Sequence, residues 1–336
     1  MRGLEELPDS TKDALLPIVH MRPWVGSHSL DRSVERLREA YGDRPVVVSI
    51  DDATDTIGSR PVHVELAELR HSAGGYDNWC RFIEGNELYI PAIQLDDLAE
   101  MEVQIRFFRQ LDRGLFVILR REAFGALRQL ADGIADLTRR GRDVCFVLDY
   151  GAANQEHQTI AARVVAQYQI LIASCPNAFV SISASSFPMD FVDRHQQEIF
   201  ERLLYDDVAG RLPQNRLIYS DRGSARAERA SGGGGVVIPP RIDYPLSTEW
   251  RFYRSEDVFG FAGYNDQARR LITRRIWDDR LRVWGTLMIE RTAAGDTSAI
   301  TSQQRAAAVR INLHLQRQAF YGDERSLYST EDDWDL

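Results

Sequence analysis

The sequence contains almost no lysine. Lys12 is the only lysine among 41 lysine and arginine residues. Schiff-base enzymes, pyridoxal-phosphate enzymes, enolase-type bases and P-loop proteins all need a lysine in the site. Because Lys12 precedes the first predicted strand, it is badly placed for each of these chemistries. The sequence therefore speaks against all four classes.

Cysteine is also scarce. Cys80, Cys145 and Cys175 are far apart, and none of them forms a CxxC motif or a Cys/His pair at zinc-ligand spacing. Cys145 stands inside an apolar run, where a thiol behaves as a small hydrophobic group. We therefore predict buried, reduced thiols rather than disulfides or zinc ligands.

Long apolar runs and an excess of positive charge are missing as well. No stretch is long enough to span a bilayer, and the N-terminus lacks the basic-then-apolar layout of a signal peptide. We therefore expect a cytoplasmic protein without a membrane partner. The net charge is −9 and the pI is near 5.4. Because a nucleic-acid binder with this balance would need a local basic stripe, we do not expect nucleic acid as a direct ligand.

What the sequence does contain is a repeated unit. A short apolar run ends in charged or polar residues, and a stretch with helical periodicity follows it. Strands that are buried on both faces have this pattern, and helices between them imply parallel crossovers. The seven runs are Leu15–Val19, Val46–Ile50, Leu88–Ile93, Leu115–Leu119, Val144–Leu148, Phe179–Ile182 and Leu217–Tyr219.

An eighth strand is predicted at Trp250–Arg254. Eight strands in βα order favour a closed (β/α)8, TIM-barrel-like fold over an open doubly wound sheet. The GxGxxG motif of dinucleotide-binding folds is absent after the early strands, which points the same way. We expect an irregular seventh and eighth strand region, because residues 223–247 form a glycine- and proline-rich loop insertion.

The predicted domain organisation is simple. Closing helices are expected around Asp266–Ile276, Thr286–Thr292 and Gln303–Phe320. We predict a single barrel domain over residues 1–322 and an acidic C-terminal tail over residues 323–336.

Residues that follow the runs would meet at the C-terminal mouth of such a barrel, where barrel enzymes keep their sites. Asp149 is the best single catalytic candidate, because it directly follows a buried run and precedes a Tyr-Gly turn. Asp51 and Arg120 come next, with Arg120 as an ion partner of either carboxylate. Asp51, Asp96 and Asp149 together would suit Mg²⁺ or Mn²⁺, which prefer oxygen ligands. The alternative is that these charges are solvated or paired with one another.

Short motifs along most of the chain match those of one known family. The matching segments are Leu16–Ile18, Arg113–Gly114 with Arg120, Val147–Gly151, Ser185–Pro188, Trp284–Gly285 and Ile311–His314. Together they resemble the beta protein family, which occurs in tailed phages and in bacterial genomes. The chain departs from the usual pattern near Tyr219–Arg222 and in the insertion at Gly232–Gly235.

The resemblance implies a barrel-like α/β fold and a phage or phage-defence setting. It implies no reaction, cofactor or set of catalytic residues. Trp284 and His314 match family positions, and we expect both to serve packing between the closing helices.

Two functions remain open at this point. The first is a binding or regulatory component in phage–host conflict that engages a partner protein through the mouth loops or the tail, with Trp334 and Leu336 as anchors. The second is a metal-assisted phosphoester or nucleotide hydrolase. In that case Asp51, Asp96 and Asp149 would hold the metal, and Arg120 would contact the phosphate. The sequence does not decide whether the protein is an enzyme.

Overall fold

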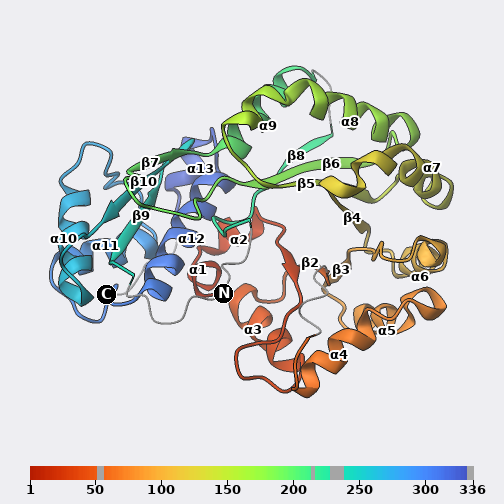
Figure 1. Cartoon of the computed structure of the whole chain (residues 1–336), viewed down its shortest axis with the longest axis horizontal. Coiled ribbons are helices and arrows are strands. Elements are labelled where there is room, and N and C mark those ends of the chain that lie inside the picture. The colour runs from red at the N-terminus through yellow and green to blue at the C-terminus, as the bar shows by residue number, and fades with distance from the viewer. Residues whose placement is uncertain (51–56, 213–215, 228–237, 331–336) are drawn as a thin grey trace.

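The computed structural model describes residues 1–50, 57–212, 216–227 and 238–330. Parallel strands and the helices that flank them make up most of the first two thirds of the chain (Figure 1). A smaller antiparallel sheet and several helices follow. Among the described helices, none is long and apolar enough to cross a bilayer.

The parallel strands lie in two sheets, and their order in space follows their order in sequence. One sheet has the order β1-β2-β3 and the other has the order β4-β5-β6-β8. A single parallel bridge between Ala92 and Phe116 links the two sheets. The strands are β1 (Ile18–His20), β2 (Val46–Ser49), β3 (Tyr89–Pro91), β4 (Leu115–Arg120), β5 (Val144–Ala152), β6 (Phe179–Ser185) and β8 (Leu217–Tyr219).

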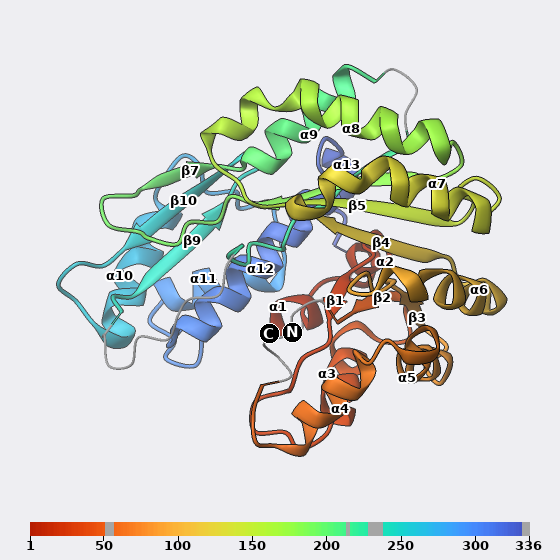
Figure 2. The same cartoon turned by 45° about the vertical axis from the view of Figure 1, so that its right-hand side comes forward.

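Helices connect these strands and cover their outer side. Figure 1 shows α8 and α9 above β5 and β6, and Figure 2 shows α7 and α8 above β5. In both views α4, α5 and α6 lie on the side of β2 and β3. The helices are α3 (Asp31–Tyr41), α4 (Pro61–Leu69), α5 (Ala73–Glu84), α6 (Met101–Leu111), α7 (Leu127–Leu137), α8 (Ala161–Ser174) and α9 (Phe200–Gly210).

The two faces of the parallel strands differ in their surroundings. Val117 and Leu119 of β4 are fully buried in the main hydrophobic core, together with helix residues such as Leu130. Their neighbours along the strand point to the other face. There Ile118 stands beside Val147 in strand register, and Val147 stands beside Ser181. This inner face is only partly covered, and it forms one wall of the cavity described below.

The last third of the chain begins with an antiparallel sheet in the order β7-β10-β9. Its strands are β7 (Gln196–Glu198), β9 (Arg241–Pro245) and β10 (Glu249–Arg254). The helices that follow share a second hydrophobic core with β9. They are α10 (Gly260–Ile272), α11 (Trp284–Ala293), α12 (Gln303–Ala319) and α13 (Glu324–Tyr328).

The beginning of the chain is fastened to α12. Two short helices, α1 (Arg2–Glu5) and α2 (Asp9–Asp13), stand ahead of β1. The Asn312 amide donates to the Glu6 carbonyl at 2.9 Å, and the Thr11 hydroxyl donates to the Gln316 amide oxygen at 2.6 Å. Asn312 also accepts from the Gly285 backbone N–H at 2.9 Å, which ties α11 to the same place. One polar side of α12 therefore holds the first turns of the chain.

The prediction of an α/β fold with parallel strands is confirmed, but a closed eight-stranded barrel is not found among the described residues. The predicted eighth strand is β10, which pairs antiparallel with β7 and β9. In β10 the side chains alternate, with Trp250 and Phe252 buried and Arg251 half-exposed. Such alternation suits an antiparallel sheet with one covered face, whereas a barrel strand is buried on both. No strand pairing joins β8 to β1 in the described ranges, so the parallel strands stay open between these two.

Two further expectations concern the insertion and the thiols. Arg241–Pro245, inside the predicted loop insertion, forms β9, and Glu324–Tyr328, inside the predicted tail, forms α13. Cys80, Cys145 and Cys175 are buried and free, as predicted. Burial raises the pKa of Cys145 to about 12, so this thiol is a packing group.

Candidate functional site

The open side of the parallel strands borders a large cavity. Its volume is about 1380 Å³, and its walls come from β1, β5, β8, β9 and α12. The inner-face side chains of Ile118, Val147 and Ser183 reach it from one side, and Arg310 and Gln318 of α12 reach it from the other. The cavity lies on the inner side of the parallel strands, where a closed barrel would have a packed interior. Because β1 and β8 do not pair in the described ranges, the strands do not close around this space.

Arginine dominates the charge of this cavity. Its described lining contains six arginines and four aspartates, which gives an excess of positive charge although the chain as a whole has a net charge of −9. A positive cavity with low-dielectric walls concentrates anions. The charged lining residues are Arg22, Arg202, Arg222, Arg226, Arg241, Arg310, Asp149, Asp206, Asp221 and Asp243.

Two of the arginines pair with one buried carboxylate at the β9 side of the cavity, and a third lies near them. Asp243 is only 4% exposed and accepts hydrogen bonds from Arg241 and Arg310, the latter at 3.0 Å. Burial would raise the pKa of Asp243, but these two guanidinium groups hold it below its ordinary value. Arg226 also lines the cavity here. We name Arg226, Arg241, Arg310 and Asp243 the Asp243 cluster.

The Asp243 cluster has more positive than negative charge. Burial lowers the pKa of Arg310, and the ion pair with Asp243 opposes this shift. The charges of Arg241 and Arg226 lower the pKa of Arg310 further. The three guanidinium groups therefore repel one another, and a bound anion would relieve that repulsion.

Aromatic rings hold two of these guanidinium groups in place. The Arg241 guanidinium carbon is 3.2 Å from the centre of the Phe191 ring, and that of Arg310 is 3.9 Å from the centre of the Phe187 ring. Ring and guanidinium attract one another when they are placed face to face. Arg241 donates through Nε and Nη2 to Asp243, and Arg310 donates through Nη1 to Asp243 and through Nε to Ser224. Within the described residues, Nη1 of Arg241 and Nη2 of Arg310 are therefore the donors left for a planar or tetrahedral oxyanion.

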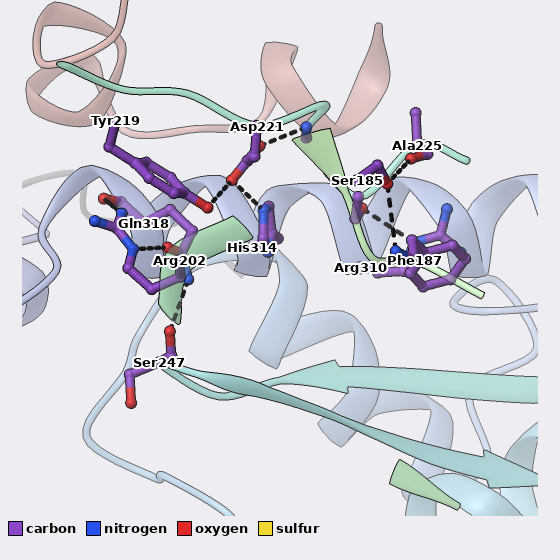
Figure 3. A network of polar contacts seen from close by, with 12 residues as sticks. Ser185, Phe187, Arg202, Tyr219, Asp221, Ala225, Ser247, Arg310, His314 and Gln318 are labelled. Atoms are coloured by element: carbon purple, nitrogen blue, oxygen red, sulfur yellow. Dashed lines mark hydrogen bonds and ion pairs between the residues drawn. The ribbon is translucent and has the colours of Figure 1, made fainter. Parts of the chain in front are cut away.

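A second network lies along the next turn of α12 (Figure 3). Asp221 accepts from His314 Nε2 at 2.8 Å, from the Tyr219 hydroxyl at 2.7 Å and from the Gly223 backbone N–H at 2.6 Å. Burial would raise the pKa of Asp221, but His314 and these hydrogen bonds lower it to about 2. The imidazole of His314 is fully buried and stacks on the Trp250 ring with 4.7 Å between centroids.

Arg202 forms the far end of the same network. It lies in α9 and is 4% exposed, and its Nε donates to the Gln318 amide oxygen at 2.8 Å. Its guanidinium carbon lies 3.3 Å from the centre of the Tyr219 ring and 4.1 Å from that of Tyr321. Figure 3 shows Arg202 beside Gln318, with His314 between this pair and Arg310.

Next to Arg202 in sequence, Glu201 is a buried acid near this network. Burial raises the pKa of Glu201 to about 7, and the negative charge of Asp221 adds to the shift while Ser186 opposes it. Its Oε2 has no hydrogen-bond partner within the described part of the chain. Glu201 is therefore the acid here that changes protonation near neutral pH.

A family model described as Beta protein matches residues 1–320. The chain belongs to the Beta protein family. It is 25% identical over 330 residues to Protein beta of Enterobacteria phage P4, which covers 95% of this chain and 89% of that protein. No solved structure matches the chain. The resemblance noted in the sequence is thereby confirmed, and this Beta protein family member is related to a phage protein.

Of the predicted site residues that the structure describes, one lies at the cavity of this Beta protein family member. Asp149 lines it and accepts from Arg222 Nη2 at 2.5 Å and from the Gly151 backbone N–H at 3.0 Å. Arg120 is exposed and stands opposite Asp149 in the register of β4 and β5. Asp96 is exposed, forms an ion pair with Arg70 and is not among the described lining residues.

The predicted metal trio is only partly described. Asp51 lies outside the described residues. Within the described ranges, no group of three or more histidine, cysteine, aspartate or glutamate side chains is placed to hold a metal ion. A site for Mg²⁺ or Mn²⁺ that includes Asp51 stays a prediction.

Sequence reasoning missed Arg310 and Gln318 of α12 and assigned His314 a packing role alone. Arg310, His314 and Gln318 recur every four residues, and this spacing puts them on one side of a helix. That spacing is the signal that could have found them. Trp284 packs in the core of the closing helices as expected, whereas His314 both packs and holds a buried carboxylate.

Proposed function

We propose that this member of the Beta protein family is a binding and regulatory component in phage–host conflict, and that its cavity takes a phosphate-bearing ligand. The relation to a phage protein supports the setting. The Asp243 cluster supports the ligand, because two arginines pair with a single carboxylate there and a third, Arg226, adds its charge beside them. Arginine forks match the oxygens of phosphate in geometry and charge.

The hydrolase alternative gains less from the described residues. A hydrolytic site of the predicted kind needs Asp149 to face a metal. Its Oδ2 instead faces Arg222 at 2.5 Å, and Asp96 faces Arg70. Each carboxylate thus has an ion-pair partner, which supports the alternative that these charges pair with other side chains. We accordingly propose ligand binding rather than hydrolysis.

Inorganic phosphate is expected to bind and to stabilise the folded protein. A ligand that binds only the folded state raises stability as its concentration exceeds the dissociation constant. Arg226→Gln is expected to weaken phosphate binding by about tenfold or more, because it removes a charged donor. Thermal unfolding across a phosphate series, at ionic strength kept constant with chloride, measures both effects.

Arg106→Gln is the matched control. Arg106 lies on the exposed side of α6 and pairs with Glu102, away from the cavity lining. Its variant should keep the response of the wild type to phosphate. A wild type that does not respond to phosphate, or equal responses of the Arg226 and Arg106 variants, would contradict the proposal.

We also propose that a protein partner binds through the C-terminal tail. Trp334 and Leu336, its predicted anchors, lie outside the described residues. A chain that ends at residue 330 keeps α13 and is expected to fold with an unchanged thermal midpoint but to lose the partner. Quantitative co-purification from phage-infected cells, beside the full chain, measures this loss. Equal partner recovery by both chains would remove the tail from the interface.

A further inference from the structure

Arg202 is a buried cation without a buried anion. It is 4% exposed, and no carboxylate among the described residues lies within ion-pair distance of it. Its hydrogen bonds go to the side-chain and backbone oxygens of Gln318, which are neutral. Charged side chains are almost never buried unless a countercharge or ligand accompanies them. The guanidinium therefore points to a negative group that is not among the described side chains and that a ligand in the cavity can supply.

The neighbours of Arg202 hold its guanidinium group in a fixed orientation. The rings of Tyr219 and Tyr321 lie against its guanidinium and fix the plane of the group. The amide oxygen of Gln318 accepts a hydrogen bond from Arg202 Nε. The amide nitrogen of Gln318 donates to the Ser247 carbonyl at 3.0 Å, which fixes the orientation of this side chain. Arg202, Tyr219 and Tyr321 all line the cavity. A group bound in the cavity can thus reach a guanidinium whose orientation is already set.

The distance between Arg202 and the Asp243 cluster is set by α12. Gln318 holds Arg202, and Arg310 belongs to the Asp243 cluster. These two residues are eight positions apart in the helix, which corresponds to roughly 12 Å along its axis. Figure 3 shows the two ends on either side of His314. Both border the same cavity.

We propose that the cavity binds a small molecule with a chain of linked phosphate groups, of which one is bound at the Asp243 cluster and another at Arg202. This inference rests on the proposed function and deepens it. A single orthophosphate would satisfy the Asp243 cluster alone. A polyphosphate chain, either inorganic or carried by a nucleotide, has the charge at both ends that the two subsites require.

Isothermal titration of the full chain with orthophosphate, tripolyphosphate and ATP tests the proposal. We expect tripolyphosphate, ATP or both to bind more tightly than orthophosphate. Tighter binding of tripolyphosphate than of ATP would indicate an inorganic polyphosphate as the ligand, and tighter binding of ATP would indicate a nucleotide. Arg202→Gln should lower the ratio of tripolyphosphate to orthophosphate affinity by about tenfold. Arg226→Gln should weaken both probes together. Arg202→Lys, which retains the charge and loses the planar fork, should lower the ratio by less and serves if the glutamine variant fails to fold.

The possible results separate the two proposals. If the wild type binds none of the three probes, the proposed function fails and this inference fails with it. If orthophosphate binds and responds to Arg226→Gln, but neither Arg202 variant lowers the ratio, Arg202 is a structural cation and only the second subsite is wrong. A lowered ratio in the Arg202 variants supports two subsites.

Discussion

Replacing His314 with phenylalanine is expected to lower the free energy of unfolding by about 3–5 kcal/mol. The phenyl ring can still stack on Trp250, so the packing contact is retained. The substitution removes the donor to Asp221, whose carboxylate is buried and has a pKa lowered to about 2 by His314 and its hydrogen bonds. A buried carboxylate that loses its hydrogen-bonded partner bears more of the cost of its own desolvation. Urea unfolding at neutral pH measures the difference.

The double variant His314→Phe with Asp221→Asn is the control for this prediction. An asparagine can accept from the Gly223 N–H through its one oxygen and donate through its NH2 group to the Tyr219 hydroxyl, and it has no charge to bury. The double variant should therefore recover much of the stability that the single variant loses. A loss below about 1 kcal/mol in the single variant would mean that the pair behaves like an exposed one.

Replacing Glu201 with glutamine is expected to stabilise the protein at alkaline pH. Burial raises the pKa of Glu201 from 4.5 to about 7, so the folded state holds the proton more tightly than the unfolded state. The contribution of this group is fully present below pH 4.5 and is lost as the pH rises through about 7. Above that pH, the buried carboxylate costs about 3 kcal/mol relative to the neutral acid. Glutamine stays neutral and avoids this cost.

Urea unfolding of the wild type and Glu201→Gln at pH 5 and pH 8.5 tests whether the substitution raises the free energy of unfolding only at the higher pH. The variant should be close to the wild type in stability at pH 5 and more stable at pH 8.5. Glu102→Gln, on the exposed side of α6, is the control and should follow the wild type at both values. Equal pH dependence of Glu201→Gln and the wild type would show that the acid is not buried as described.

The two effects concern one region, the wall between α9 and α12. Glu201 and Arg202 are neighbours at the start of α9, and Arg202 faces Gln318 of α12. The charged groups that would bind the ligand are buried between packed elements. We therefore expect the stability of the fold to rise when the ligand binds.

The apolar runs of the sequence predicted the parallel strands well. Leu217–Tyr219 was expected as the seventh strand, and it pairs with β6 in parallel. The prediction worked because a strand buried on both faces is a local property of consecutive residues. It went wrong at Trp250–Arg254, where a strand was expected correctly but its partner was not. The register with β9 and β7 depends on segments far away along the chain.

The candidate site divides in the same way. The sequence by itself placed Asp149 directly after a buried apolar run, although β5 continues past it to Ala152. Through the lone Lys12, the sequence also argued against the lysine-dependent chemistries. Only the tertiary structure decided that α12 faces the open side of the parallel strands, which brings Arg310 to Asp243 and His314 to Asp221. Periodicity and strand endings are encoded by neighbouring residues. The meeting of charges 67 and 93 positions apart is decided by how the elements pack.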